Sequence, residues 1–380
     1  MMYAIFLNLT RACNFRCKYC YEANTYCADS MKIDDVPDII SFIDNLKESH
    51  LYKRNGFDKI LLTFFGGEPT LNKSVLKELV DYYNKKDDVV YSIVTNGSNL
   101  DTLYDIFLPI KHTNVNGLSK VHIQVSYDGI PIHDINRLDI NGNPTGDLIK
   151  SNIKQLLHDG FNVSVKSVIK PDHFKYMLSA YNDIKDVFSS YSNMGSYFPT
   201  IDYYNSYKDD YCIDELEQIL LDIAKEEIEF YNSNKRFFFT WFNKDANRIC
   251  AAGKDMLAID VDLSVYPCEG CYYAPSDQHL IGHIKDKDIY NKLEQRREYL
   301  LSYEHNNNLC KTCSTSTCFR CNLIKFAHSK KEDYAERWYD YTDQSWLCRY
   351  YITVGKIKQA LYHILFNNQK KEEKSFVSTC

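Results

Sequence analysis

The sequence predicts an α/β protein whose parallel β-sheet curls into a partial (β/α)6 barrel. Short apolar segments that are typical of strands lie at 4–9, 59–64, 89–95, 120–126, 162–169 and 197–203. Helical patterns separate them near 34–48, 73–85, 146–158 and 173–188. Because strands that alternate with helices favour right-handed crossovers, the sheet should be parallel.

The chain has 380 residues, more than one ordinary globular domain contains. We expect the barrel to occupy 1–235, and an amphipathic helix over 213–235 to lead out of it. A small cysteine-rich domain with short hairpins and helices should follow over 236–350. A final helix is expected within 351–380, with a disordered tail from residue 369 onward.

Composition and charge exclude several classes of protein. The formal net charge is −6, without the basic excess that nucleic-acid-binding proteins normally carry. Neither a secretory signal nor an apolar run long enough to span a membrane is present in the sequence. Fourteen cysteines in such a chain indicate metal binding in a reducing cytoplasm rather than disulfides.

The first cysteine cluster follows the first predicted strand. Cys13, Cys17 and Cys20 form a C-x3-C-x2-C pattern. Three thiolates on one short loop can hold three irons of a [4Fe–4S] cluster and leave the fourth iron open to a substrate. A zinc site is the alternative, but zinc would normally take a fourth protein ligand.

Polar motifs also follow the next three strands. Gly66-Gly67-Glu68-Pro69 comes after the second strand, Asn96 after the third, and Ser126 ends the fourth, with Arg137 eleven positions further on. Each motif alone could be an ordinary turn. Since active sites of parallel β/α barrels form at the carboxyl ends of the strands, all of them should meet on one rim.

These motifs together resemble the radical S-adenosylmethionine (SAM) family. Tyr19 stands between the last two cysteines as in the family signature, and Gly66–Pro69 is similar to its GGEP element. The resemblance implies that the N-terminal cluster binds SAM and cleaves it reductively to a 5′-deoxyadenosyl radical, which takes a hydrogen atom from a substrate. It also implies SAM contacts from Gly66, Gly67 and Glu68 at the amino group, Asn96 at the ribose, Ser126 and Arg137 at the carboxylate, and Tyr21 at the adenine.

The second cysteine region resembles a SPASM domain, which carries two auxiliary [4Fe–4S] clusters in enzymes that modify peptides and proteins. Eight thiolates within about a hundred residues would suffice for two such clusters. The family order assigns Cys250, Cys268 and Cys321 to the first auxiliary cluster, and the cysteine count adds Cys271. The family order also assigns Cys310, Cys313, Cys318 and Cys348 to the second auxiliary cluster. The C-x2-C-x4-C-x2-C spacing is narrower than the family's usual one, and zinc is again the alternative.

Glu269 directly follows Cys268. Sulfatase-maturating relatives have an aspartate at this place that removes a proton from the substrate, so the resemblance implies a general base here. The alternative is a glutamate at a turn, either solvated or paired with a lysine.

Three functions fit the sequence. The first is a maturase that oxidises or cross-links a ribosomally made peptide through a thioether or carbon–carbon bond. The second is an anaerobic sulfatase-maturating enzyme that converts Cys or Ser to formylglycine. The third is a non-catalytic electron-transfer or zinc-binding protein on the same scaffold. For the enzymes we expect a cytoplasmic, anaerobic monomer with a peptide or protein substrate and an electron donor such as flavodoxin or ferredoxin, and neither nucleic acid nor membrane as a partner.

Overall fold

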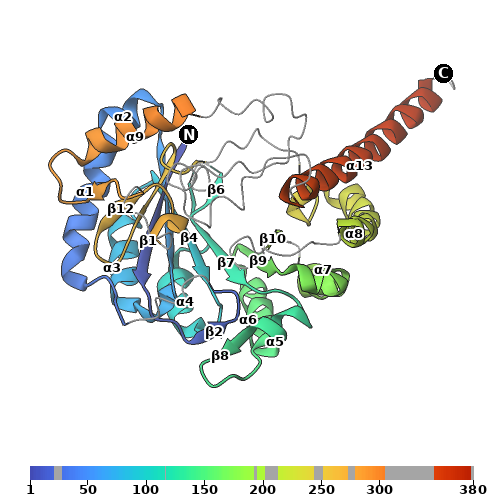
Figure 1. Ribbon diagram of the computed structural model, residues 1–380, viewed down its shortest axis with the longest axis horizontal. Coiled ribbons are helices and arrows are strands. Elements are labelled where there is room, and N and C mark those ends of the chain that lie inside the picture. Colours follow the sequence, from blue (N-terminus) through green and yellow to red (C-terminus); the bar gives the residue numbers. More distant parts are fainter. Residues whose placement is uncertain are drawn as a thin grey trace.

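One nine-stranded sheet forms the centre of the molecule in the computed structural model (Figure 1). The structure describes residues 1–20, 28–115, 117–191, 195–201, 213–243, 251–272, 279–303 and 346–377. The strand order in the sheet is β10-β9-β7-β4-β3-β1-β11-β12-β13. Every pair from β10 to β11 is parallel, and only the last two pairs are antiparallel.

The six predicted barrel strands are confirmed, and they lie side by side in chain order. They are β1 (Met2–Thr10), β3 (Lys59–Gly66), β4 (Val89–Thr95), β7 (Val121–Ser126), β9 (Val163–Ile169) and β10 (Tyr197–Ile201). The parallel sheet of a partial barrel is therefore the fold class that the sequence predicts. Residues 202 and 203 of the last predicted strand lie outside the described residues.

Helices cover the outside of this sheet (Figure 1). The predicted ones are α1 (Val36–Glu48), α3 (Lys73–Tyr83), α6 (Gly146–His158), α7 (Met177–Ser189) and α8 (Ile213–Asn234). The sequence analysis did not predict α2 (His50–Arg54), α4 (Leu100–Phe107), α5 (Ile132–Asn136) and α9 (Ile289–Tyr303). The shortest of these, α2 and α5, have five residues each, too few to show a helical period.

Alternation along the strands separates an apolar outer face from a more polar inner face. On β1, Ile5 and Leu7 are fully buried in the core beneath the helices, and Asn8 is on the other face. On β7, His122, Gln124 and Ser126 keep accessible surface while the residues between them are buried. Parallel strands in register place partners on the same face, so Ser126 and Lys166 of β9 are inner-face neighbours.

The sheet continues into the region where the sequence predicts a separate domain. Strand β11 (Met256–Ile259) pairs in parallel with β1, and β12 (Ser264–Tyr266) and β13 (Gly282–His283) extend it by antiparallel pairing. Just beyond β11, the buried carboxylate of Asp260 accepts a hydrogen bond from Asn8 Nδ2 at 2.7 Å and pairs with Arg11. The domain boundary near residue 235 remains a prediction. Strands β11, β12 and β13 follow that residue in the chain, yet they are hydrogen-bonded into the same sheet as β1.

The C-terminal helix, α13 (Trp346–Val377), begins earlier and extends further than the sequence predicts. It packs against α8 and projects from the body of the molecule (Figure 1). Over residues 369–377 the structure describes helix where the sequence analysis expects a disordered tail, and Lys, Glu and Gln favour helix as readily as they favour disorder. Among the described helices, none has the length and apolar character needed to cross a membrane.

The buried Arg11–Asp260 pair should stabilise the junction between β1 and the added strands. The two side chains are only 16% and 4% exposed, so Asp260→Ala would leave a cation without its carboxylate partner. We expect the free energy of unfolding to fall by about 3 kcal/mol, measured by chemical denaturation. The control is Asp81→Asn, which removes an exposed partner of Lys77 and should cost less than about 1 kcal/mol. Equal effects of the two variants would contradict the expectation.

Candidate active site

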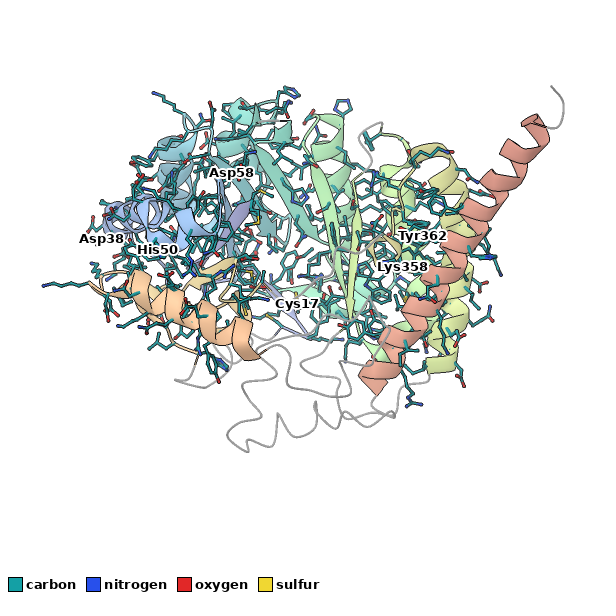
Figure 2. The ribbon with its side chains drawn as sticks, turned by 90° about the horizontal axis from the view of Figure 1, so that it is seen from above. Cys17, Asp38, His50, Asp58, Lys358 and Tyr362 are labelled. Carbon is teal, nitrogen blue, oxygen red and sulfur yellow. The ribbon has the colours of Figure 1, made fainter. Side chains whose placement is uncertain are left out.

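The cysteine loop leaves the carboxyl end of β1 and is held by a short antiparallel ladder. Strand β2 (Phe15–Cys17) pairs with β8 (Arg137–Asp139), and this register places Cys17 opposite Arg137. The amide of Phe15 donates to Cys13 Sγ at 3.4 Å, and the amide of Cys20 donates to the Cys17 carbonyl at 3.1 Å. Cys17 is half-buried, and in the view of Figure 2 it is seen between the end that carries Asp38 and His50 and the C-terminal helix.

The two glycines after β3 allow that strand to touch the start of the cysteine loop. The amide of Gly67 donates to the Thr10 carbonyl at 2.8 Å, and that of Glu68 donates to the Ala12 carbonyl at 2.9 Å. A Cβ atom on Gly67 would lie 2.4 Å from the Ala12 oxygen. Gly66 has φ +134°, which side chains rarely allow. The Gly-Gly pair is therefore required by close backbone approach.

Glu68 is fully buried and joins the ends of two strands. Its Oε1 accepts hydrogen bonds from the Thr70 amide, the Thr70 hydroxyl and the Thr95 hydroxyl at 3.1, 2.7 and 2.7 Å. Its Oε2 accepts from the amide of Asn96 at 2.7 Å. Burial raises the pKa of this carboxyl, and these donors act in the opposite direction. The contact with the SAM amino group implied by the resemblance remains a prediction.

Asn96 connects the turn after β4 with the cysteine loop. Its Nδ2 donates to Asn14 Oδ1 at 2.8 Å and lies 4.0 Å from Cys13 Sγ, while its Oδ1 accepts from the Ser98 amide at 2.9 Å. The side chain is thus fixed at both ends beside the first cysteine.

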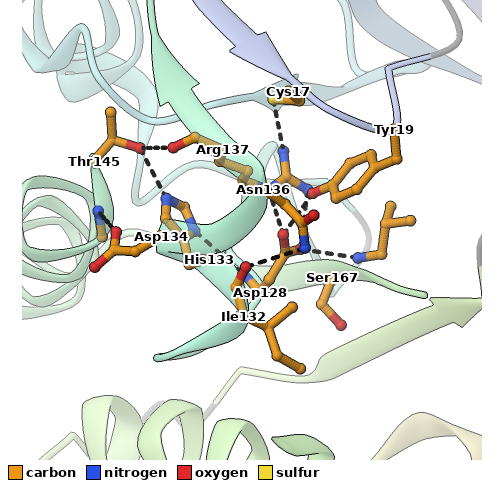
Figure 3. Close-up of polar contacts among 12 residues, drawn as sticks. Cys17, Tyr19, Asp128, Ile132, His133, Asp134, Asn136, Arg137, Thr145 and Ser167 are labelled. Carbon is orange, nitrogen blue, oxygen red and sulfur yellow. Dashed lines mark hydrogen bonds and ion pairs between the residues drawn. The ribbon is translucent and has the colours of Figure 1, made fainter. Parts of the chain in front are cut away.

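Arg137 forms the centre of a buried polar network (Figure 3). Its Nε and Nη2 donate to the two carboxylate oxygens of Asp128 at 3.0 and 3.2 Å, and its Nη1 lies 4.0 Å from Cys17 Sγ. Tyr19 donates its hydroxyl to Asp128 at 2.5 Å, and its ring lies 5.2 Å below the guanidinium. His133 and Thr145 support the backbone of this segment, since the Thr145 hydroxyl donates to the Arg137 carbonyl at 2.8 Å.

The three N-terminal thiols fit an iron–sulfur cluster. They lie close enough for the charges of Cys17 and Cys20 to raise the pKa of Cys13, although burial is the larger cause and takes it to about 12. N–H groups of Phe15, Asn96 and Arg137 reach two of the sulfurs, and such donors stabilise cluster thiolates. No described group of three His, Cys, Asp or Glu side chains converges on a single metal ion. A four-iron cluster does not need that convergence, because each thiolate binds its own iron.

The second cysteine region is described only in part. Cys268 and Cys271 have their sulfurs 3.5 Å apart, and their contact together with burial raises the pKa of Cys268. Cys348 lies in α13, but its side chain is outside the described residues. Also outside them are Tyr21, Cys250, Cys310, Cys313, Cys318 and Cys321. The structure therefore brings together two of the eight predicted auxiliary ligands, and the assignment of the others stays a prediction.

Glu269 is at the start of the 3-10 turn η7 (Glu269–Tyr272), and its charge interacts with that of Lys166. Its Oε2 is buried and accepts no hydrogen bond from the described residues. Burial raises the pKa of Glu269 and lowers that of Lys166, while the attraction between the two charges opposes both shifts. No direct ion pair joins these two residues in the described part of the chain.

Sequence reasoning missed Lys166 and Asp128 as site residues. Lys166 places a charge on the inner face of β9, level with Ser126 of β7, and a lysine within a mainly apolar predicted strand was the available signal. Asp128 looked like an ordinary turn residue beside Gly129. Its role depends on contacts with Tyr19 and Arg137, which are far from it in the chain.

We expect Gly67→Ala to reduce the iron bound by the reconstituted protein several-fold, because the added methyl group would displace Ala12 and the cysteine loop. Iron per chain and the visible absorption of the cluster would measure this. Gly142→Ala is the control: its φ of +83° makes alanine unfavourable, yet nothing lies within 4 Å of the added carbon. Normal iron content in Gly67→Ala would show that the close approach is not required.

Comparison with known proteins agrees with this geometry. Residues 7–173 match the model of the Radical SAM superfamily. The radical SAM cyclopropyl synthase TigE of Paramaledivibacter caminithermalis is 26% identical over 337 residues, which cover 82% of this chain and 65% of that protein. The cysteine-type anaerobic sulfatase-maturating enzyme of Clostridium novyi is 24% identical over 333 residues, which cover 80% of this chain and 82% of that protein.

Solved structures show the same fold. Native anSMEcpe with bound AdoMet and Cp18Cys peptide aligns with a TM-score of 0.72 at 18% identity, covering 97% of this chain and 99% of that one. Streptococcus suis SuiB bound to its precursor peptide SuiA aligns with a TM-score of 0.60 at 12% identity, covering 86% of this chain and 73% of SuiB.

The chain spans 65% of TigE and 44% of the uncharacterized protein MJ0907 of Methanocaldococcus jannaschii, so these alignments leave part of each relative unmatched. The match to the superfamily model lies on the strands that carry the cysteine loop, the two glycines and Arg137. Residues 7–173 therefore form a radical SAM domain, and the chain is an enzyme homologous to the anaerobic sulfatase-maturating enzymes.

Proposed function

We propose that this enzyme is a peptide maturase, which removes a hydrogen atom from a ribosomally made peptide and leaves an oxidised or cross-linked residue. The observation that carries the proposal is the arrangement around the cysteine loop, where Asn96 and Arg137 direct N–H groups at the sulfurs of Cys13 and Cys17. Relatives that align over most of the chain include a radical SAM cyclopropyl synthase and an anaerobic sulfatase-maturating enzyme, and SuiB aligns in a complex with its precursor peptide, which supports the proposal.

Cys13, Cys17 and Cys20 would hold a [4Fe–4S] cluster, and the backbone at Gly66 and Gly67 with Asn96, Ser126, Arg137 and Tyr21 would hold SAM. The family chemistry that this pair supplies when bound is reductive cleavage of SAM, which yields a radical able to remove a hydrogen atom from carbon. The chain's own contribution is to hold the cysteine loop against β3 and to exclude water from the buried Glu68, Asp128 and Arg137.

The C-terminal cysteines would hold two auxiliary [4Fe–4S] clusters, which could accept the electron that remains on the substrate. A peptide substrate, an electron donor such as flavodoxin or ferredoxin, and a monomeric state in the cytoplasm complete the proposal. The proposed domain division is a barrel over 1–235, a SPASM domain over 236–350 and the C-terminal helix beyond.

A second candidate function is the conversion of Cys or Ser to formylglycine in a sulfatase. The observations that favour it are the match to nearly the whole length of anSMEcpe and the position of Glu269 directly after Cys268. The interpretation as a non-catalytic protein has lost its support, because the chain contains a radical SAM domain and is homologous to enzymes.

The two candidates differ in their products. The reduced protein would be incubated without oxygen with SAM and either peptides encoded beside its gene or a sulfatase peptide with a target cysteine. Release of 5′-deoxyadenosine with loss of two hydrogens from a neighbouring peptide supports the maturase. Formylglycine in the sulfatase peptide supports the second function. Absence of 5′-deoxyadenosine in all reactions, with the cluster reconstituted, would refute both.

Cys17→Ala should abolish SAM cleavage, because one iron would lose its protein ligand. We expect at least a hundredfold less 5′-deoxyadenosine, measured by chromatography. Retained turnover in the purified, oxygen-protected variant would mean that the N-terminal cysteines hold no catalytic cluster.

Glu269 is the candidate general base, with Lys166 favouring its charged form. Glu269→Gln should reduce peptide modification at least tenfold and leave release of 5′-deoxyadenosine intact, because only proton removal is lost. Glu298→Gln, at a side chain that is 63% exposed, is the control.

The pH dependence follows from the raised pKa of Glu269. A base must be unprotonated, so modification should decline as the pH falls through that raised value, and it should decline at a higher pH than for an ordinary glutamate. In Lys166→Met the decline should move to still higher pH, because the stabilising cation is gone. A profile identical to that of the unmodified enzyme would contradict the role of Lys166.

A further inference from the structure

The network around Arg137 contains more than a SAM contact requires. Asp128 accepts four hydrogen bonds: two from Arg137, one from the Tyr19 hydroxyl and one from the Val168 amide at 2.9 Å. The carboxylate is fully buried, and Arg137 is only 6% exposed. A buried pair with every oxygen satisfied fixes the guanidinium plane in one orientation.

That orientation directs the remaining nitrogen at a cluster cysteine. Because β2 and β8 pair with Cys17 opposite Arg137, the backbone already places the two side chains together. The amide of Lys18 adds a 2.9 Å hydrogen bond to the Asn136 carbonyl at the end of this ladder. Nη1 then lies 4.0 Å from Cys17 Sγ, and Figure 3 shows the contact.

Cys17 lies beside the ion pair formed by Arg137 and Asp128. Arg137 Nη1 lies 4.0 Å from Cys17 Sγ, whereas the two oxygens of Asp128 accept hydrogen bonds from Nε and Nη2 of the same guanidinium. The positively charged member of the ion pair is therefore the one that reaches the sulfur. Positive charge and N–H donors at cluster sulfurs stabilise the more negative, reduced state of an iron–sulfur cluster.

We propose that Asp128 and Tyr19 are positioning residues that hold Arg137 on the sulfur of Cys17, and that this contact raises the reduction potential of the N-terminal cluster. The inference rests on the proposed cluster but goes beyond SAM binding, since it assigns Arg137 a second task and gives Asp128 and Tyr19 a role. The contact between Arg137 and Cys17 is already present in the structure, so no described residue has to move to form it.

The test measures the potential of the cluster rather than turnover. The full-length protein would be reconstituted without oxygen and titrated with reductant while the electron paramagnetic resonance of the reduced cluster is followed. A variant with Cys13, Cys17 and Cys20 all changed to Ala identifies, by subtraction, the signal that belongs to the N-terminal cluster. If that subtraction removes no signal, the N-terminal cluster is absent and the proposed function fails together with this inference, whereas a cluster signal whose potential does not respond to the variants overturns this inference alone.

Arg137→Gln should lower the midpoint potential of that signal, because the cation is lost. Tyr19→Phe should lower it by a smaller amount, because Asp128 loses one donor and Arg137 loses part of its support. Arg137→Lys keeps the charge but cannot pair with both oxygens of Asp128 and still reach Cys17, so an intermediate potential is expected. Iron content should stay normal in Tyr19→Phe and Arg137→Lys.

Tyr91→Phe is the matched control. Tyr91 is also a buried tyrosine with one hydroxyl hydrogen bond, at 3.1 Å to the Val80 carbonyl. It should lose stability without any change of potential. Unchanged midpoints in Tyr19→Phe and Arg137→Lys, or a shift in Tyr91→Phe equal to theirs, would overturn the inference. Should Arg137→Gln fail to fold, the other two variants still decide the question.

Discussion

A single buried carboxylate connects the parts of the rim on which the site is built. Glu68 accepts from the turn after β3 and from the end of β4, and the backbone around it is bonded to Thr10 and Ala12 at the start of the cysteine loop. An apolar side chain would leave four donors without an acceptor in the interior, which explains why the polar residue is needed there. The loop, the two glycines and Asn96 all depend on this arrangement.

The parts that the sequence predicted well are those with local signals. Alternating apolar segments located all six barrel strands, and the glycine pair located the turn after β3, where the structure then shows the close approach to Ala12. The cysteine spacing identified the loop, and the order of the motifs placed them on one rim.

The rest depends on contacts between distant residues. Asp128 is an ordinary turn residue until Arg137 and Tyr19 are seen around it, and nothing in the spacing indicates that β2 pairs with β8. Strand β11 was expected in a separate domain because its hydrophobic pattern cannot reveal which edge it will join. Helix α13 was underestimated because charged residues that form helices also occur in disordered tails.

The pairing of β1 with β11 has a consequence for synthesis of the chain. The strand that carries the cysteine loop has one edge that only residues near 256–259 can cover, some 250 positions later. Until the ribosome has released that segment, the nascent chain presents an open strand edge to its surroundings. The segment that covers it also leads into Cys268 and Cys271, so this edge of the sheet closes only when the cysteine-rich part of the polypeptide has begun to emerge.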